Sequence, residues 1–269
     1  MTYNDFNTFY LQASASTSGG SSGSPVLEIN GNAVALQAGG RVEASTDYFL
    51  PLDRVKRALE LIQRDEPVSR GCIQTQFLYR AFDEVRRLGL GIETEKKIRT
   101  MFPEEIGMLV AEVVLPEGPA SGFLEEGDIL ISVDGKFVTK FVPMENILDL
   151  NVNRSISVLI CRGGEEHTLS IKVQDLFTIT PDKYLECGGA KMNNLSYQLA
   201  RQFCVPVKGV YLCENSGMFK LDGGEGGFII KEVDSKPTPD LDAFIEVMKT
   251  IADRERYVNP SVMPRPFCF

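Results

Sequence analysis

The chain has 269 residues, of which 43% are hydrophobic, and it carries a formal net charge of −9 at pH 7. Its length favours two domains or three small ones, and its composition is typical of a globular protein with a buried core. The acidic balance argues against nucleic acid as a direct partner, because phosphate contacts need clustered lysine and arginine. No apolar run reaches the length that spans a bilayer, so we expect no membrane partner.

Six cysteines and a single histidine limit the metal chemistry. No two cysteines form a C-x-x-C pair, so a structural zinc site is improbable, and we expect no metal and no other cofactor. A chain of this size needs no disulfides for stability. We therefore expect buried, reduced thiols, which favours the cytosol or nucleus.

The first 66 residues begin with a polar segment and continue as strands. Residues 14–24 are rich in serine and glycine and, taken alone, are typical of a flexible linker. After them Pro25–Ile29 alternates as a strand, Asn30 and Gly31 favour a two-residue hairpin, and Asn32–Ala38 returns as a buried strand. Gly39 and Gly40 are expected to end that strand.

A helix should follow these strands. Asp53 can cap a helix that runs to about Arg64, and Val55, Ala58, Leu59 and Ile62 form one apolar stripe at helical spacing. The sequence Asp65-Glu66-Pro67 ends the helix, and we place a domain boundary there.

Residues 67–176 alternate between strand and helix patterns. Apolar strands are expected at Gly107–Leu115 and Asp128–Val133, and a hairpin at Ser155–Arg162 and Thr168–Val173 around Gly163 and Gly164. Met144, Ile147 and Leu148 indicate a short amphipathic helix.

An internal repeat follows at a spacing of about 100 residues. The matching pairs are Gly127 with Gly227, Ile129 with Ile229, Val133 with Val233, Asp134 with Asp234, and Lys136 with Lys236. The helical stripe recurs as Phe244, Val247 and Met248. We expect a second unit over 177–258, truncated because the prolines of the irregular tail 259–269 disfavour a central strand.

The strongest chemical motif is Gly20-Ser21-Ser22-Gly23-Ser24-Pro25-Val26. It resembles the nucleophile loop Gly-x-Ser-Gly-Gly-Pro of chymotrypsin-like and HtrA proteases. The resemblance implies that Ser22 is the nucleophile and that the backbone N–H groups of Gly20 and Ser22 stabilise the oxyanion. Ser24 stands where the family usually has glycine, a departure expected to perturb the turn.

Two further segments support this resemblance. Ala33–Ala38 resembles the strand that lines the primary specificity pocket of these proteases. The stretch from Asp47 to Val55 resembles the HtrA sequence F-A-I-P-I-D-x-V, which closes the second barrel. Together they imply the C-terminal remnant of a chymotrypsin-like β-barrel in residues 1–66.

A trypsin-like serine needs a histidine as general base and an aspartate that orients it. In this family both precede the serine, whereas no histidine stands among the 21 residues before Ser22. The only histidine, His167, falls in the predicted strand Glu165–Leu169, where we expect a surface residue. The chain alone is therefore expected to be inactive.

A second motif resembles PDZ domains. Leu124–Lys136 matches the PDZ core G-D-x-I-x-x-V-N/D-G, and Gly118-Pro119-Ala120 resembles the turn before it. PDZ domains add an extended peptide to a sheet edge and hold its carboxylate with backbone N–H groups. In HtrA proteins that loop follows an Arg-Gly pair, which implies Arg70, Gly71, Cys72, Ile73 and Gln74 here; a plain strand start is the alternative. Gly71 lies outside the core stripe, so we expect its substitution to weaken binding and not the fold.

The second unit departs from the PDZ pattern. It lacks aspartate after Gly227, and Ser235 stands at the position of Gly135. Cys187-Gly188-Gly189-Ala190 is the candidate for its loop. A structural role is favoured over ligand binding.

Residues 1–258 resemble an HtrA-like serine protease with PDZ domains, closest to the fungal nuclear pro-apoptotic type. The expected architecture is β-rich and multi-domain, with the barrel remnant followed by two α+β PDZ domains. The resemblance implies a serine endopeptidase in the nucleus, with the cytoplasm as a second compartment. It further implies protein substrates bound through unfolded or C-terminal peptide segments, and a homo-oligomer in the full-length protein. The alternative is a non-catalytic PDZ adaptor.

Overall fold

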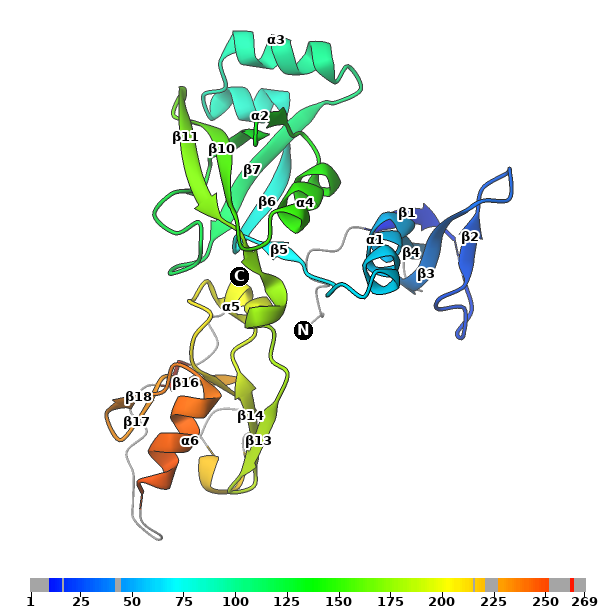
Figure 1. The fold of residues 1–269 in the computed structure, drawn as a ribbon. Coiled ribbons are helices and arrows are strands. Elements are labelled where there is room, and N and C mark those ends of the chain that lie inside the picture. The colour runs from blue at the N-terminus through cyan, green and yellow to red at the C-terminus, as the bar shows by residue number, and fades with distance from the viewer. Residues whose placement is uncertain are drawn as a thin grey trace. The chain divides into compact units, whose positions relative to one another are not determined.

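The computed structural model describes residues 10–15, 17–41, 45–214, 216–220, 227–251 and 262–263. The chain divides into two compact units, Met1–Ser69 and Arg70–Phe269. We call them the N-terminal and C-terminal units and describe each by itself (Figure 1).

The N-terminal unit is a four-stranded antiparallel sheet followed by one helix. Its strands run in the order β1-β4-β3-β2. The elements are β1 (Leu11–Ser14), β2 (Pro25–Leu27), β3 (Ala33–Arg41), β4 (Thr46–Pro51) and α1 (Leu52–Gln63). The predicted hairpin is confirmed, because Gly31 has a φ of +85° and its N–H donates to the carbonyl of Glu28.

Two expectations for this unit are wrong. Strand β3 continues through Gly39 and Gly40 to Arg41, with a register shift between Gln37 and Gly39, because its partner β4 is long enough to pair with it. Helix α1 begins at Leu52 after Pro51, whose side chain offers no cap, so Asp53 lies in the first turn and does not cap the helix.

The apolar stripe of α1 faces solvent within the described part of this unit. Val55 is 36% exposed, Leu59 52% and Ile62 63%. Among the described apolar side chains of the unit, only Ala35 is fully buried. The sequence pattern therefore predicts the helix correctly, but its apolar stripe stays largely exposed within the described part of the unit.

The C-terminal unit contains two lobes, and the first is built on the sheet β11-β10-β8-β7-β6. We call residues 70–176 the first lobe. Its elements are β5 (Gly71–Cys72), β6 (Thr75–Ala81), α2 (Phe82–Arg87), α3 (Ile92–Met101), β7 (Gly107–Val114), β8 (Ile129–Val133), β9 (Lys136–Phe137), α4 (Phe141–Leu150), β10 (Ser155–Arg162), β11 (Glu165–Lys172) and β12 (Gln174–Asp175).

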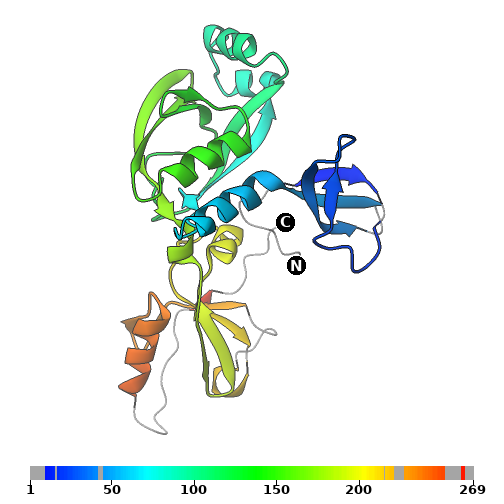
Figure 2. The same cartoon turned by 45° about the vertical axis from the view of Figure 1, so that its right-hand side comes forward.

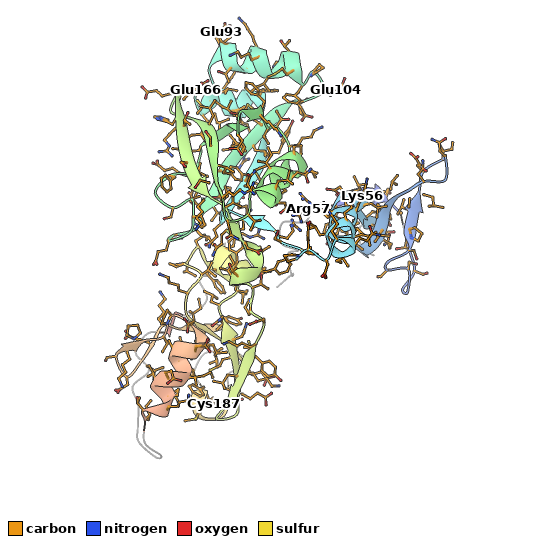
Figure 3. The ribbon with its side chains drawn as sticks, in the orientation of Figure 1. Lys56, Arg57, Glu93, Glu104, Glu166 and Cys187 are labelled. Atoms are coloured by element: carbon orange, nitrogen blue, oxygen red, sulfur yellow. The ribbon has the colours of Figure 1, made fainter. Side chains whose placement is uncertain are left out.

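Alternating side chains of this sheet form two separate cores. Leu109 and Ala111 of β7 pack in one cluster with Met144, Ile147 and Leu148 of α4. Met108 and Val110 pack in the other cluster with side chains of α2 and α3. Because neighbouring strand residues point to opposite faces, the sheet is covered by α4 on one face and by α2 and α3 on the other. Figure 3 shows Glu93, Glu104 and Glu166 directed away from this core.

We call the described residues after 176 the second lobe, whose smaller sheet has the order β13-β14-β15-β16-β19. Its first short helix begins at Leu176, the last residue of the first lobe. Its elements are the short 3-10 helices at Leu176–Ile179 and Gly217–Phe219, β13 (Tyr184–Cys187), β14 (Ala190–Asn194), α5 (Tyr197–Phe203), β15 (Val210–Glu214), β16 (Phe228–Ile230), β17 (Glu232–Val233), β18 (Lys236–Pro237) and α6 (Leu241–Lys249). Helix α6, drawn in orange in Figure 2, is the longest helix among the described elements of this lobe.

Each lobe buries apolar side chains of one helix. Phe244 of α6 is fully buried with Ile230 and Val233, and Met144 and Ile147 of α4 are buried in the first lobe. Within the expected tail 259–269, Val262–Met263 forms a two-residue edge strand, β19, on β16. The rest of that tail lies outside the described residues.

The cysteine prediction holds only in part. Five cysteines are described, and all five are free thiols. Cys72 and Cys161 are buried, Cys187 is half-buried at the end of β13 (Figure 3), but Cys204 and Cys213 are exposed. Cys268 lies outside the described residues. No helix in the described part of the chain combines the length and the apolar character needed to cross a membrane.

Candidate functional site

The loop around Ser22 joins β1 to β2 and is tied to β3. The Gly23 N–H donates to the Gln37 carbonyl at 2.7 Å, and the Gln37 N–H donates to the Ser24 carbonyl at 2.9 Å. Gly20 and Gly23 have φ values of +95° and +83°, which side chains other than glycine rarely adopt. The loop therefore presents Ser22 on a tight, fixed turn with an exposed side chain.

The neighbouring N–H groups suit an oxyanion site. Within the described residues, neither the Gly20 N–H nor the Ser22 N–H donates to a backbone carbonyl. Ser24 does not have a positive φ, so a side chain fits at this position without backbone strain. The expected perturbation of the turn by Ser24 is thus absent from the structure.

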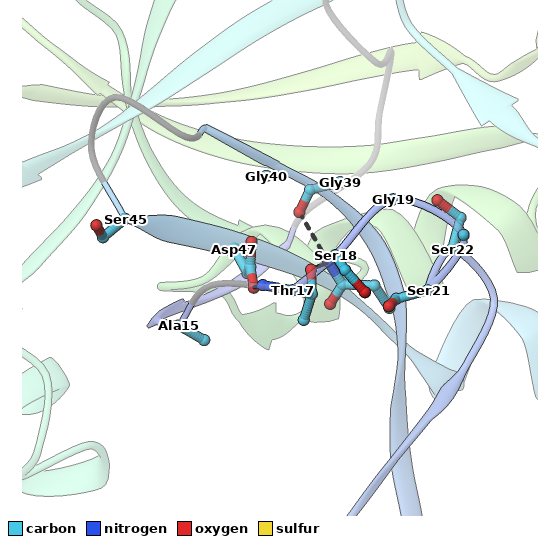
Figure 4. Close-up of a pocket in the computed structure, with 12 residues that line it drawn as sticks. Ala15, Thr17, Ser18, Gly19, Ser21, Ser22, Gly39, Gly40, Ser45 and Asp47 are labelled. Atoms are coloured by element: carbon cyan, nitrogen blue, oxygen red, sulfur yellow. Dashed lines mark hydrogen bonds between the residues drawn. The ribbon is translucent and has the colours of Figure 1, made fainter.

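A cavity of about 180 Å³ lies next to this turn and is lined by Ala15, by residues 17–22, by Ser45 and by residues of β3 and β4. Figure 4 shows the Asp47 side chain beside Thr17, with Ser21 and Ser22 further along the same loop. The Thr17 N–H donates to Asp47 Oδ2 at 2.9 Å, and Gln37 Nε2 donates to Thr17 Oγ1 at 2.8 Å.

The N-terminal unit holds no histidine to activate Ser22. The only histidine of the chain, His167, lies on β11 of the C-terminal unit, opposite Ile160 in the hairpin, and its side chain is exposed. Its predicted place on a strand surface is confirmed. A serine without a general base is an ordinary alcohol.

The predicted peptide-binding loop starts at β5, which pairs with β12. The Gly71 N–H donates to Asp149 Oδ1 at 2.8 Å, and Arg70 Nε approaches the same oxygen at 3.3 Å. Arg70 also lies 3.7 Å from Glu145 Oε2. The carboxylate that the Arg-Gly pair holds here is therefore internal and belongs to the end of α4.

Close packing also explains why position 71 is glycine. A Cβ on Gly71 would lie 2.2 Å from the Leu148 carbonyl oxygen and 2.8 Å from the Asp149 nitrogen. Both are backbone atoms, which cannot turn away. The expectation that Gly71 can be substituted without harm to the fold is wrong, because the end of α4 packs directly on it.

The rest of the loop is buried. Ile73 belongs to the core beneath α4, while the Gln74 N–H approaches Cys72 Sγ at 3.3 Å. Gln74 has a φ of +53°, and its amide donates to Gln174 Oε1 at 2.8 Å. The loop is thus pinned to β12 on one side and to the core on the other.

Cys72 makes a contact that the sequence did not indicate. Its sulfur hydrogen-bonds the hydroxyl of Tyr197, a residue of α5 that is 2% exposed. Burial raises the pKa of the Cys72 thiol to about 12, and burial also raises the pKa of the Tyr197 hydroxyl. The charge of Arg201 acts on both groups. The first turns of α5 therefore form part of the surroundings of the loop.

The edge next to the loop is available for an added strand. Strand β6 follows the loop and is an edge strand of the sheet. Among the described elements, the backbone groups on its outer side therefore have no partner strand. Phe77 of β6 and Leu148 of α4 share one core cluster, which places the helix beside this edge. A sheet edge flanked by a helix is the geometry that PDZ domains use for peptides.

The loop predicted for the second lobe is a hairpin turn. Gly188 and Gly189 connect β13 to β14 with φ values of +56° and +87°, the geometry of a tight two-residue turn. The Gly188 carbonyl accepts from the Met218 N–H at 2.9 Å, so the turn is covered by Gly217–Phe219. Residues 187–190 therefore have no free concave nest for a carboxylate.

Comparison with known proteins identifies the class. The PDZ-like domain family matches residues 178–254. Over nearly its whole length the chain is homologous to HtrA-like serine proteases, and its close homologues are named pro-apoptotic serine protease NMA111. The protein of Phaeosphaeria nodorum is 57% identical over 260 residues, which are 95% of this chain and 26% of that protein. The protein of Aspergillus fumigatus is 55% identical over 257 residues, 95% of this chain and 25% of that protein.

The chain thus spans about a quarter of the length of the curated relatives that it matches. Among solved structures it is similar to the HtrA-type protease AlgW with tripeptide, at 20% identity and a TM-score of 0.45 over 62% of this chain and 53% of that one. The serine endoprotease from Yersinia pestis gives 20% identity and a TM-score of 0.38 over 62% and 52%. TM-scores at this level do not establish a shared fold, so the identification rests on the sequence homology.

Proposed function

We propose that this chain is the nucleophile-bearing end of an HtrA-like serine endopeptidase, followed by two PDZ modules. The proposed divisions are 1–66 for the protease part with its helix, 67–176 for the first PDZ module and 177–258 for the second. The observation that carries the proposal is the Ser22 turn, which is hydrogen-bonded to β3 and lies beside a cavity. Within the described residues, two N–H groups of this turn donate to no backbone carbonyl.

In the proposed mechanism, Ser22 Oγ attacks the scissile carbonyl and the Gly20 and Ser22 N–H groups bind the oxyanion. The general base comes from outside these 269 residues, because the chain has one histidine and that residue is on the surface of β11. The base takes the Ser22 proton and gives it to the leaving nitrogen as the scissile C–N bond breaks, which releases an amine and leaves an acyl-enzyme on Ser22. Water then hydrolyses this ester, releases the acid and restores the Ser22 hydroxyl. Without the base, we expect the chain alone to be inactive.

The PDZ modules bind or position protein substrates in this proposal. The first module offers the β6 edge, and Ile73 and Gln74 complete the loop beside it. The pro-apoptotic role in this proposal is taken from the names of the homologues. Nuclear location with the cytoplasm as a second compartment, a quality-control role and a homo-oligomer are proposed from the resemblance alone.

A fluorophosphonate probe tests the catalytic part. In the full-length protein that carries this segment, we expect stoichiometric labelling and casein cleavage, both abolished by Ser22→Ala. The 269-residue chain alone should show neither. Labelling of the full-length protein that persists in Ser22→Ala would refute the assignment of the nucleophile.

The second candidate is a non-catalytic peptide-binding adaptor. It is favoured for the isolated chain by the absence of a base and by the open β6 edge. If the full-length protein is not labelled but the C-terminal unit binds hydrophobic C-terminal peptides by isothermal titration, the adaptor is the correct function.

A further inference from the structure

The cavity beside Ser22 is lined mainly by glycine and by small hydroxyl side chains, with one amide and one charged side chain among them. Among the described residues that line it, Asp47 carries the only formal charge, and its side chain comes from β4. Asp47 is 4% exposed, and Gln37 of β3, which also lines the cavity, is 6% exposed. A polar interior of this kind is costly unless a ligand completes its hydrogen bonds.

Two elements of the site hold the Asp47 carboxylate in place. Its Oδ2 accepts the Thr17 N–H from the nucleophile loop at 2.9 Å. Its Oδ1 lies over Gly40, where an added Cβ would be 2.2 Å away. Glycine at position 40 therefore makes room for the carboxylate, whereas at Gly39 an added Cβ would meet no atom within 4 Å.

The side-chain oxygen of Gln37 is a buried acceptor that no donor among the described residues satisfies. Its Nε2 donates to Thr17 Oγ1 at 2.8 Å and to the Gly39 carbonyl at 3.2 Å. Since a carbonyl can only accept, this contact fixes which end of the amide is the nitrogen. The Oε1 atom is buried and has no hydrogen-bond partner among the described residues. Buried acceptors of this kind are nearly always satisfied, so Gln37 Oε1 is an acceptor that a bound group could complete.

We propose that this cavity receives the substrate side chain on the acyl side of the scissile bond and selects a cationic one, lysine or arginine. The inference rests on the proposed proteolytic function and names its substrate class. The cationic head would pair with Asp47 and donate to Gln37 Oε1. An aliphatic side chain would leave Gln37 Oε1 without a donor and the buried charge of Asp47 without a counter-ion, which discriminates strongly against it.

The first test uses the full-length protein and peptides that differ only at this position. We expect kcat/KM for lysine or arginine to exceed that for valine at least tenfold. Asp47→Asn should lower this ratio at least tenfold, because the amide can still accept the Thr17 N–H but has lost the charge. Asp53→Asn, the same change on the exposed side of α1, should leave the ratio unchanged, and Ser22→Ala should abolish cleavage of every peptide.

A second test needs no catalysis. p-Aminobenzamidine, an aryl cation, should bind both the full-length protein and its Ser22→Ala variant with a rise in fluorescence, and Asp47→Asn should weaken this binding at least tenfold. Circular dichroism must show that the variant is folded; if it is not, Gln37→Leu replaces it and should lower the lysine-to-valine ratio at least threefold.

The two tests distinguish failure of the cationic pocket from failure of the proteolytic function. Cleavage that prefers valine, or a ratio unchanged in folded Asp47→Asn, would overturn the cationic pocket and leave the protease intact. Binding of the aryl cation that depends on Asp47, in a protein that cleaves no peptide, would support the pocket and overturn the proteolytic function. Absence of that binding in the wild-type protein would count against the pocket.

Discussion

Gly71→Ala should destabilise the first lobe, although the position lies outside the predicted core stripe. The added methyl group would lie 2.2 Å from the Leu148 carbonyl oxygen, so either β5 or the end of α4 must move. Such movement also stretches the 2.8 Å hydrogen bond from the Gly71 N–H to the fully buried Asp149 carboxylate.

Two known effects set the magnitude. Overpacking of a close backbone contact costs about 1–3 kcal/mol. Loss of a hydrogen bond to a buried charged group adds about 1.5–3 kcal/mol. We expect a loss of roughly 2.5–6 kcal/mol in the free energy of unfolding, which at about 4 °C per kcal/mol lowers Tm by roughly 10–24 °C in a lobe of about 100 residues.

Urea titration of the chain followed by circular dichroism measures the loss. Gly91→Ala is the matched control, since Gly91 has an ordinary φ and a Cβ there would meet no atom within 4 Å. If Gly71→Ala is as stable as Gly91→Ala, the close approach of α4 to β5 is wrong. Hydrogen exchange at the end of α4 should increase in Gly71→Ala only.

Four further predictions test other parts of the chain. Asp128 is 1% exposed and accepts two 2.7 Å hydrogen bonds from Arg162, so Arg162→Leu leaves a buried carboxylate without its cation and should lower the free energy of unfolding by about 3 kcal/mol. Lys249→Leu, which removes a surface ion pair, should lower it by under about 1 kcal/mol; urea titration measures both. Iodoacetamide at pH 8 should modify exposed Cys204 well before Cys72. Because the raised pKa of Cys72 means that this thiol ionises in the unfolded chain first, stability should fall between about pH 9 and pH 12. Cys72→Ala should make this fall smaller, while the raised pKa of Tyr197 keeps a fall above about pH 10; an unchanged pH profile would contradict the role of Cys72. Amide exchange in β3 and β4 should be faster than in β7, since the N-terminal unit buries little apolar surface; equal protection would refute this.

The regular elements could be predicted where the local pattern sets both structure and burial. The apolar run at Gly107–Val114 and the stripe of Met144, Ile147 and Leu148 became β7 and α4 with those side chains buried. The stripe of α1 has the same spacing, yet it is exposed within the N-terminal unit. Periodicity reports the conformation of a segment, but whether another segment covers it is a non-local property.

The candidate site also has a part that the local sequence predicts and a part that it does not. The Ser22 turn could be found because glycine and serine at fixed spacing encode a local backbone shape. The cavity could not, since Thr17, Gln37 and Asp47 come from three separate segments. Asp149 stands 78 residues from Gly71, and no local pattern marks a carboxylate that will reach its N–H.

The contact between Cys72 and Tyr197 affects how the first PDZ module should be studied. Tyr197 belongs to α5, beyond the expected end of that module at residue 176, yet it is 2% exposed and its hydroxyl bonds the first residue after the Arg-Gly pair. A fragment that ends at residue 176 would keep every PDZ motif and lose this phenol, so Cys72 would gain solvent and its thiol pKa would fall toward the ordinary value. Peptide affinities measured on such a fragment would describe a loop with different surroundings. The smallest unit that preserves the loop is therefore one that includes α5.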